Sequence, residues 1–260
     1  MPTNPPLLVE RRGAIATLQF NRPEAMNALD LATAQALLAA MQGIAGDASV
    51  RAVLLKGAGR AFVAGGDLAM LAADPVQGAK DLLGPLNQAL LLLQNLSAPV
   101  IAQVHGAAAG AGLSLMLMCD FVLAAEGSKF NLAYINLGAS CDVGASWALP
   151  RLVGLRRALE IAMLGETFGA DEALRLGLIN RVLPAADLEA AAQAFAQRLA
   201  SGPTLAHGHM RRLMRNAFDH DLPTQLAAEA EAFVACARSA DLPEGIEAFH
   251  AKRPAAFQGR

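Results

Sequence analysis

Two glycine-rich stretches in the first half of the chain give the strongest indication of chemistry. The first covers residues 61–68 with the sequence AFVAGGDL, and the second covers residues 105–113 with HGAAAGAGL. Each is typical of an apolar strand that ends in a turn of small residues and leads into a helix. Such turns leave backbone N–H groups unpaired and pointing outward. Two turns that face one another could therefore hold a developing oxyanion, such as a thioester enolate.

A nucleotide-binding loop is a second interpretation of such stretches. Neither stretch has the G-x-G-x-x-G spacing of a dinucleotide site, and neither has the Lys-Ser/Thr pair of a P-loop. A third interpretation is that the small residues only permit tight packing between a strand and a helix. For one turn alone, packing and oxyanion binding explain the sequence equally well. Two turns, each after a strand, favour an anion-stabilising site.

Asp142 is the candidate acid–base group. It lies in the sequence GASCDVG, residues 138–144, just before a helical pattern. Asp is common at helix N-caps, so the residue type alone favours a structural role. The surroundings are unusually apolar, however, and a carboxylate there would have a raised pKa suited to proton transfer. The residues alone leave both interpretations open.

The other reactive side chains give weaker indications. His207 and His209 are two residues apart on an expected helix and so diverge, which argues against a metal site. The sole tyrosine, Tyr134, and the sole tryptophan, Trp147, are of types found more often in a core than in catalysis. The cysteines have neither disulfide nor metal-ligand spacing; they are Cys119, Cys141 and Cys236. We therefore expect no metal. The basic cluster at residues 211–215 predicts a solvated helix face, with contact to a phosphate group as the alternative.

Composition limits the possible partners. The chain has 260 residues, of which 54% are hydrophobic and 17% charged, and this favours a compact protein whose surface is partly covered by other subunits. The formal net charge of -2 gives no support for nucleic-acid binding. The segment Met1–Pro6 lacks the regions of a signal peptide, and polar residues interrupt the apolar runs too often for a bilayer span. We expect a cytoplasmic protein with no membrane partner.

Strand and helix patterns alternate through the first half of the chain and predict an α/β core. The segment 74–78 is expected to be mobile, because Pro75 and Gly78 interrupt the pattern, and Gly84-Pro85 is a candidate helix break. The expected strands cover residues 7–9, 14–20, 52–55, 100–104 and 121–124. The expected helices cover residues 29–44, 67–72, 79–96 and 113–118.

The second half is mainly helical. One strand is expected at residues 178–182, and the apolar helical faces suggest packing onto a neighbour, in the same chain or across subunits. The expected helices cover residues 147–152, 156–164, 170–176, 188–201, 204–218 and 222–239.

These motifs occur in an order that resembles the crotonase, or enoyl-CoA hydratase/isomerase, superfamily. The resemblance implies a spiral of strand–helix turns over residues 1–200 and a C-terminal helical region, residues 201–260, used in trimerisation. It further implies acyl-CoA substrates, a homotrimer or dimer of trimers, and no cofactor beyond the coenzyme A within the substrate. The segments that carry it are NRPEAMNAL (21–29), the two glycine stretches, PRLVG (150–154), ALRLGLIN (173–180) and FHAKR (249–253).

Carried over by position, the two oxyanion N–H donors of the family fall on Gly66 and Ala111. The second position is usually glycine, but alanine keeps the N–H. Hydratases of the family have glutamates where Ser114 and Tyr134 stand, so the resemblance disfavours ordinary hydration. Besides these two residues, the resemblance assigns three substrate-binding positions near the first turn: Ala64, Asp67 and Leu68.

Asp142 falls where dienoyl-CoA isomerases, 4-chlorobenzoyl-CoA dehalogenase and the ring-epoxide isomerases of phenylacetate catabolism have a catalytic aspartate. The first group also has a glutamate at position 134, and the dehalogenase needs a histidine where Asn87 stands. The ring-epoxide isomerases are therefore the most similar group. The expected activity is acyl-CoA isomerisation with Asp142 as a proton shuttle, and the alternatives are an enoyl-CoA hydratase (a lyase) or a non-catalytic acyl-CoA-binding protein.

An apolar acyl pocket is expected near the turns and Asp142. Tyr134 could stack on an aromatic ring or donate to an epoxide oxygen, and filling volume is an equally good interpretation. The candidate lining residues are Leu71, Leu82, Leu86, Leu137 and Trp147.

Overall fold

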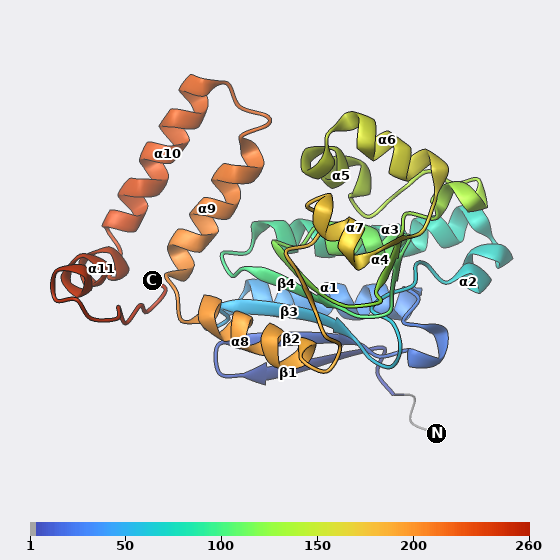
Figure 1. The fold of residues 1–260 in the computed structure, drawn as a ribbon, viewed down its shortest axis with the longest axis horizontal. Helices are drawn as coiled ribbons and strands as arrows, with labels where there is room; N and C mark the ends of the chain where they lie inside the picture. Colours follow the sequence, from blue (N-terminus) through green and yellow to red (C-terminus); the bar gives the residue numbers. More distant parts are fainter. Residues whose placement is uncertain (1–3) are drawn as a thin grey trace.

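A computed structural model describes residues 4–260 as two sheets with helices packed around them (Figure 1). Residues 1–3, part of the segment without signal-peptide features, lie outside the described residues. The larger sheet has six strands in the order β1-β2-β3-β4-β6-β9, and the smaller has three in the order β5-β7-β8. The α/β class expected from the sequence is confirmed.

The larger sheet begins with an antiparallel hairpin, β1 with β2, and all its other strand pairs are parallel. Helices cover both faces, so its central strands are almost continuously apolar. On β3, for example, Leu54 packs toward α8 (Leu188–Ala200), whereas Leu55 packs in the main core with α1 (Leu31–Ala45). The strands are β1 (Leu7–Arg12), β2 (Ile15–Phe20), β3 (Ala52–Gly57), β4 (Val100–Val104), β6 (Phe121–Ala125) and β9 (Arg181–Leu183).

The smaller sheet was not expected from the sequence. Its strands are β5 (Ala107–Ala109), β7 (Lys129–Asn131) and β8 (Phe168–Gly169). They are too short to show an alternating pattern, and β5 lies inside the second glycine stretch. Stacking of Phe130 on Phe168, with ring centroids 5.8 Å apart, supports this sheet.

The region expected to be mobile is instead the start of a helix. In α3 (Pro75–Asn95), Asp74 is the N-cap, and its side chain accepts a hydrogen bond from the Gln77 N–H at 3.0 Å. Proline is favoured at the first helical position, so Pro75 begins the helix here. The expected break at Gly84-Pro85 is also absent, because α3 continues through Pro85 with Leu86 buried beside it. The expected interruptions at Pro75 and Gly78 and at Gly84-Pro85 are therefore absent, and mobility of residues 74–78 stays a prediction.

Three C-terminal helices form an arm that stands away from the sheets, on the left of Figure 1. They are α9 (Thr204–Asn216), α10 (Leu222–Ala237) and α11 (Asp241–His250), and α11 was not expected as a separate helix. A domain division at residue 200 stays a prediction. The remaining helices are α2 (Leu68–Ala73), α4 (Ala111–Leu117), α5 (Ala145–Val153), α6 (Leu155–Leu164), α7 (Ala170–Arg175) and two short 3-10 turns, η1 (Pro23–Ala25) and η2 (Tyr134–Leu137).

A buried ion cluster fixes α9 to the core. Asp120 forms an ion pair with Arg211 Nε at 2.7 Å, and it accepts hydrogen bonds from Arg215 Nη2 at 2.6 Å and from the Val100 N–H at 2.7 Å. Arg211 is only 8% exposed. The expectation that this basic cluster forms a solvated face was therefore wrong for these two arginines. Within residues 4–260, no helix combines the length and apolar composition needed to cross a membrane.

We predict that Asp120→Asn lowers the free energy of unfolding by about 3–5 kcal/mol, because it leaves buried guanidinium charge without a carboxylate. Urea denaturation followed by circular dichroism measures this loss. The matched control is Asp219→Asn, which removes the exposed partner of Arg151 and should cost less than about 1 kcal/mol. Equal losses in the two variants would contradict the anchoring role of Asp120.

Candidate active site

The two glycine turns lie against each other and are joined by backbone hydrogen bonds. The Ala109 N–H donates to the Val63 carbonyl at 3.0 Å, and the Phe62 N–H donates to the Ala107 carbonyl at 3.1 Å. A Cβ at Gly112 would lie only 1.9 Å from the Val63 oxygen, so this contact requires glycine. The packing interpretation of the small residues is therefore correct for Gly112, and it is compatible with an oxyanion site between the turns.

The N–H groups of Gly66 and Ala111 donate to no acceptor in residues 4–260. Ala111 is the first residue of α4, where helix geometry leaves the N–H unpaired. A Cβ at Gly66 would meet only the methyl groups of Leu82 and Leu71, at 3.7 and 3.9 Å. Gly66 is thus not required for packing. Both residues offer a free backbone donor on adjoining turns, the arrangement that an oxyanion hole needs.

Asn27 fixes the backbone of the first turn through hydrogen bonds, a role that the sequence did not reveal. Its Nδ2 donates to the carbonyls of Ala58, Ala61 and Phe62 at 2.9, 2.8 and 3.1 Å, and the side chain is buried. Its backbone has φ +60°, a left-handed conformation that asparagine tolerates better than most residues. Its place in the NRPEAMNAL motif was the available signal.

The three residues assigned to substrate binding near the first turn have different surroundings. Asp67 pairs with Arg22 at 2.9 Å and caps α2 through the Ala69 N–H at 3.1 Å. The bond from Arg22 lowers the Asp67 pKa, so this carboxylate is committed to holding the turn in place. Leu68 is 52% exposed at the start of α2, and the Ala64 N–H donates to the Met26 carbonyl at 3.1 Å.

A chain of side-chain hydrogen bonds connects Asp142 to the second turn. The Tyr134 hydroxyl donates to the Asp142 carboxylate. The hydroxyls of Tyr134 and Ser114 lie 2.9 Å apart, and Ser114 Oγ lies 3.2 Å from the Gly110 carbonyl oxygen. The structure therefore brings together three residues that the sequence could place only singly. The N-cap interpretation of Asp142 was wrong, because Gly144 is the N-cap of α5 and no side chain caps that helix.

The pKa of Asp142 is raised because the carboxyl group is largely buried, and the hydrogen bond from Tyr134 opposes this effect. This direction confirms the expectation from the apolar sequence around it. Burial, followed by the nearby Asp142 charge, also raises the pKa of Tyr134, so the tyrosine keeps its proton. The site therefore offers one carboxylate with a raised pKa and two neutral hydroxyls.

The backbone beside Asp142 is strained. Val143 has φ +52°, which is unusual for a β-branched residue, and its side chain is buried. Ala133, next to Tyr134, also has a positive φ of +40°. Such strain persists only where the surrounding packing fixes it, so both sides of the Tyr134–Asp142 contact are held in place.

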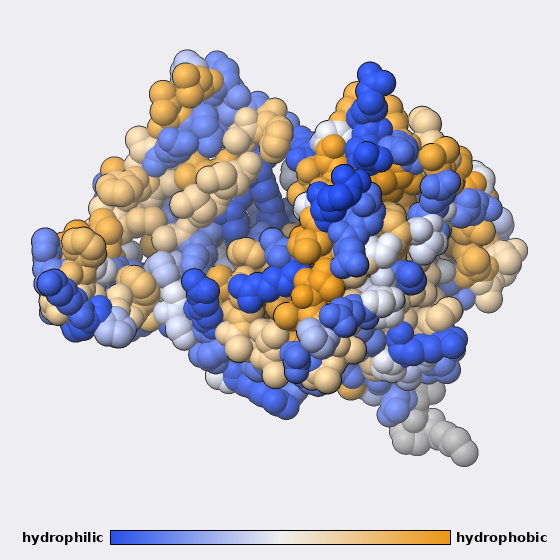
Figure 2. Space-filling view, viewed as in Figure 1, coloured by the Kyte–Doolittle hydropathy of each residue, from blue (hydrophilic) through white to orange (hydrophobic). Residues whose placement is uncertain are grey.

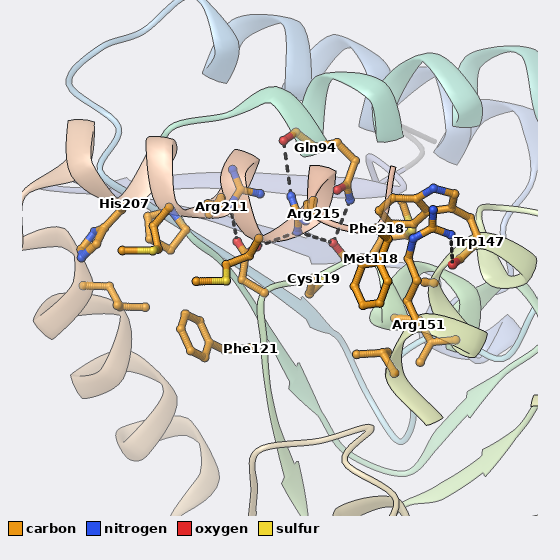
Figure 3. Close-up of a pocket in the computed structure, with 18 residues that line it drawn as sticks. Gln94, Met118, Cys119, Phe121, Trp147, Arg151, His207, Arg211, Arg215 and Phe218 are labelled. Carbon is orange, nitrogen blue, oxygen red and sulfur yellow. Dashed lines mark hydrogen bonds and ion pairs between the residues drawn. The ribbon is translucent and has the colours of Figure 1, made fainter. Parts of the chain in front are cut away.

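The expected acyl-pocket residues do not all gather at this site. Leu71 and Leu82 lie beside Gly66, whereas Leu86 is buried in the core and Leu137 is 60% exposed. Trp147 lines a separate hollow of about 430 Å³ between α5 and α9, where it stacks on Arg151 (Figure 3). Neither Gly66, Ala111 nor Asp142 lines this hollow, so the assignment of Trp147 to the acyl pocket was wrong. Its position five residues after Asp142 was misleading because α5 turns its ring toward the arm.

Residues 4–260 contain no group of three or more His, Cys, Asp or Glu side chains placed to hold a metal ion. The cysteines in this part of the chain are unpaired.

Comparison with known proteins places the chain in a family. The model of the enoyl-CoA hydratase/isomerase family matches residues 10–260. The chain is 40% identical over 246 residues to a protein of Rhodobacter capsulatus named "probable enoyl-CoA hydratase", covering 95% of each. It is 38% identical over 250 residues to the 1,2-epoxyphenylacetyl-CoA isomerase of Escherichia coli, again covering 95% of each.

The fold agrees with these matches. The crystal structure of an enoyl-CoA hydratase from Bacillus anthracis superposes with a TM-score of 0.93 at 32% identity, covering 98% of this chain and all of the other. Sequence and structure therefore agree that this chain belongs to the enoyl-CoA hydratase/isomerase family.

Proposed function

We propose that this member of the family is an acyl-CoA isomerase. The observation that supports this is the single carboxylate of the site, Asp142, which is largely buried and among residues 4–260 is bonded to the neutral hydroxyl of Tyr134 and to no cation. A reaction that takes a proton from the substrate and returns it needs one such group. The names of the relatives include both hydratases and an isomerase, so the choice between the activities rests on this site.

In this mechanism, the thioester oxygen accepts hydrogen bonds from the Gly66 and Ala111 N–H groups. The Asp142 carboxylate removes the proton from C2 of a 3-enoyl-CoA, and the electron pair of that C–H bond moves into the enolate. The protonated Asp142 then donates the proton to C4 on the same face, and the double bond comes to lie between C2 and C3. At the end of the reaction Asp142 is again an ionised carboxylate. A 1,2-epoxyphenylacetyl-CoA ring is the second candidate substrate.

A hydratase is the main alternative, because several relatives carry that name. Hydration needs one group to activate water and one to protonate carbon. Ser114 and Tyr134 hold the positions where the family resemblance expects glutamates, and burial keeps the tyrosine protonated. A non-catalytic acyl-CoA-binding protein is the third candidate, and it would bind thioesters without turning them over.

We also propose a homotrimer or dimer of trimers in the cytoplasm. Apolar side chains are exposed on the arm, and Figure 2 shows apolar patches on the arm and on the neighbouring core. Association would remove this area from water. The most exposed apolar side chains of the arm are Met214, Phe218, Leu222, Phe233 and Phe249.

We predict that Asp142→Asn reduces isomerase turnover of 3-enoyl-CoA by at least about 100-fold, with coenzyme A binding retained, because the amide cannot carry the proton. The raised pKa means that ionised Asp142 destabilises the folded chain at neutral pH, so the variant should melt no lower than the parent. In the parent, kcat/KM should fall as pH drops through a value above 3.8, the ordinary pKa of Asp.

Two results would contradict this assignment. One is turnover by Asp142→Asn within about tenfold of the parent. The other is rapid hydration of crotonyl-CoA that is lost in Asp142→Asn and kept in Ser114→Ala, which would make the chain a hydratase.

The few charges at the site predict a preference for bulky or aromatic acyl groups, because apolar area buried near the thioester adds affinity. A series of kcat/KM values for short linear 3-enoyl-CoAs and for phenylacetyl-derived CoA substrates measures this preference. Faster turnover of the short linear compounds would exclude an aromatic pocket and leave the proton transfer by Asp142 untouched.

We predict that the chain sediments as a trimer or hexamer at micromolar concentration, because monomers would leave the apolar arm in water. Equilibrium sedimentation checks this. A stable monomer at that concentration would contradict the proposed oligomer.

A further inference from the structure

The hydrogen-bond chain from Asp142 has more contacts than hydrogens while the carboxyl group is ionised. It contains three contacts, Asp142 to Tyr134, Tyr134 to Ser114, and Ser114 to the Gly110 carbonyl. Tyr134 and Ser114 each supply one hydrogen. One contact must therefore lack a hydrogen until Asp142 gains a proton.

In the ionised state, the charge of Asp142 determines which contacts are filled. Tyr134 donates to the carboxylate, since hydrogen bonds to ionised groups are the strongest in such a chain. The tyrosine oxygen is then an acceptor for Ser114, whose hydroxyl lies 2.9 Å away. The Gly110 carbonyl still accepts the Ser114 backbone N–H at 3.0 Å. The contact without a hydrogen is the one between Ser114 Oγ and Gly110.

Protonation of Asp142 at Oδ1, the oxygen that faces Tyr134, supplies the missing hydrogen and reverses the chain. The Asp142 hydroxyl donates to Tyr134, Tyr134 donates to Ser114, and Ser114 donates to the Gly110 carbonyl. Ser114 is fully buried, so no bulk water competes for these bonds. The carboxyl group has a hydrogen-bond partner in both protonation states, and only two hydroxyl rotations connect them.

The far end of the chain lies on the peptide group that carries the expected oxyanion donor. The Gly110 carbonyl and the Ala111 N–H belong to one amide, and a bond donated to the carbonyl makes the N–H a stronger donor. While the enolate exists, Asp142 carries the substrate's proton, and the chain is reversed when that proton lies on Oδ1 and points toward Tyr134. The same O–H turns back toward the substrate to protonate C4. The reversed chain therefore strengthens the Ala111 N–H at the stage when the substrate oxygen carries most charge.

We propose that Tyr134 and Ser114 are positioning residues that form a reversible hydroxyl relay, which transmits the protonation of Asp142 to the Gly110–Ala111 peptide. The role of this relay in catalysis rests on the proposed function, whereas its hydrogen bonds are present without substrate. Among residues 4–260, burial and the bond from Tyr134 are the only causes that shift the Asp142 pKa, with no cation or second carboxylate contributing from α4, η2 or α5. The titratable side chain next to Asp142 in the amino-acid sequence is Cys141.

Infrared difference spectroscopy during a pH titration tests the first half of the relay without substrate. The C=O stretch of protonated Asp142 is identified by its loss in Asp142→Asn. In Tyr134→Phe we expect its titration midpoint to rise by about one pH unit, because a charge-assisted bond is lost. In Ser114→Ala we expect a smaller rise, of a few tenths of a unit. An unchanged or lower midpoint in Tyr134→Phe would overturn the relay.

The matched control for Ser114→Ala is Ser128→Ala. Ser128 is equally buried and donates to the Val104 carbonyl at 3.4 Å, away from the relay. We expect the titration midpoint of Asp142 in Ser128→Ala to equal that in the parent. Ser114→Ala with the same midpoint as Ser128→Ala would show that the chain ends at Tyr134 and would overturn its extension to Gly110.

Bound cinnamoyl-CoA tests the second half, because its absorption moves to longer wavelength when its carbonyl is polarised. We expect the red shift to grow as pH falls through the Asp142 midpoint, and to lose most of this dependence in Ser114→Ala but not in Ser128→Ala. Equal pH dependence in all three proteins would overturn the link to Ala111. The midpoints are measured without turnover, so the two proposals can fail separately. If only the relay is wrong, the protein is still an isomerase that depends on Asp142. If only the isomerase assignment is wrong, the midpoint shifts are still observed.

Discussion

The site depends on the direct contact of two backbone turns. A Cβ at Gly106 or Gly112 would lie 1.9 Å from the carbonyl oxygen of Arg60 or Val63, so no side chain fits between the turns. Their approach fixes Gly110, at the start of α4, beside Gly65. Ser114 lies one turn further along α4, and through it Tyr134 and Asp142 are placed relative to the same backbone. The glycines are needed for this closeness, whereas the Ala111 N–H is free because it lies in the first turn of α4.

Two buried aspartates show how the same side chain can serve stability or chemistry. Asp120 forms ion pairs with two guanidinium groups and accepts a hydrogen bond from a backbone N–H, so its charge is compensated and holds α9 in place. Within the described part of the chain Asp142 has one neutral donor and no cation, and burial raises its pKa. The strained Val143 adds a further local cost. The fold therefore tolerates an unfavourable carboxylate at one position while it compensates another fully, as expected where a group must exchange protons.

The sequence predicted those parts of the molecule that depend on local pattern. The glycine turns, the strands of the larger sheet and most helices follow from apolar periodicity and small residues. The strands of the smaller sheet are too short to show a period. Arg211 and Arg215 looked exposed because their partner, Asp120, belongs to a distant part of the chain. For the same reason the contacts among Ser114, Tyr134 and Asp142 could not be predicted: each residue lies on a different segment, and only the packed fold brings them together.

Replacement of two expected carboxylates by hydroxyls changes what the site can do electrostatically. Neighbouring carboxylates repel one another, so that the protonation of each depends on the other. Here the raised pKa of Tyr134 keeps that residue neutral, and Ser114 does not ionise, so Asp142 changes charge without a second titrating acid bonded to it. A single exchangeable proton is sufficient for a reaction that returns the proton to the substrate. It is poorly suited to a reaction that must hold a water nucleophile and a carbon acid at once. Within residues 4–260, no other charged group at the site compensates the Asp142 carboxylate. This makes the carboxylate costly to bury, and it also favours isomerisation over hydration.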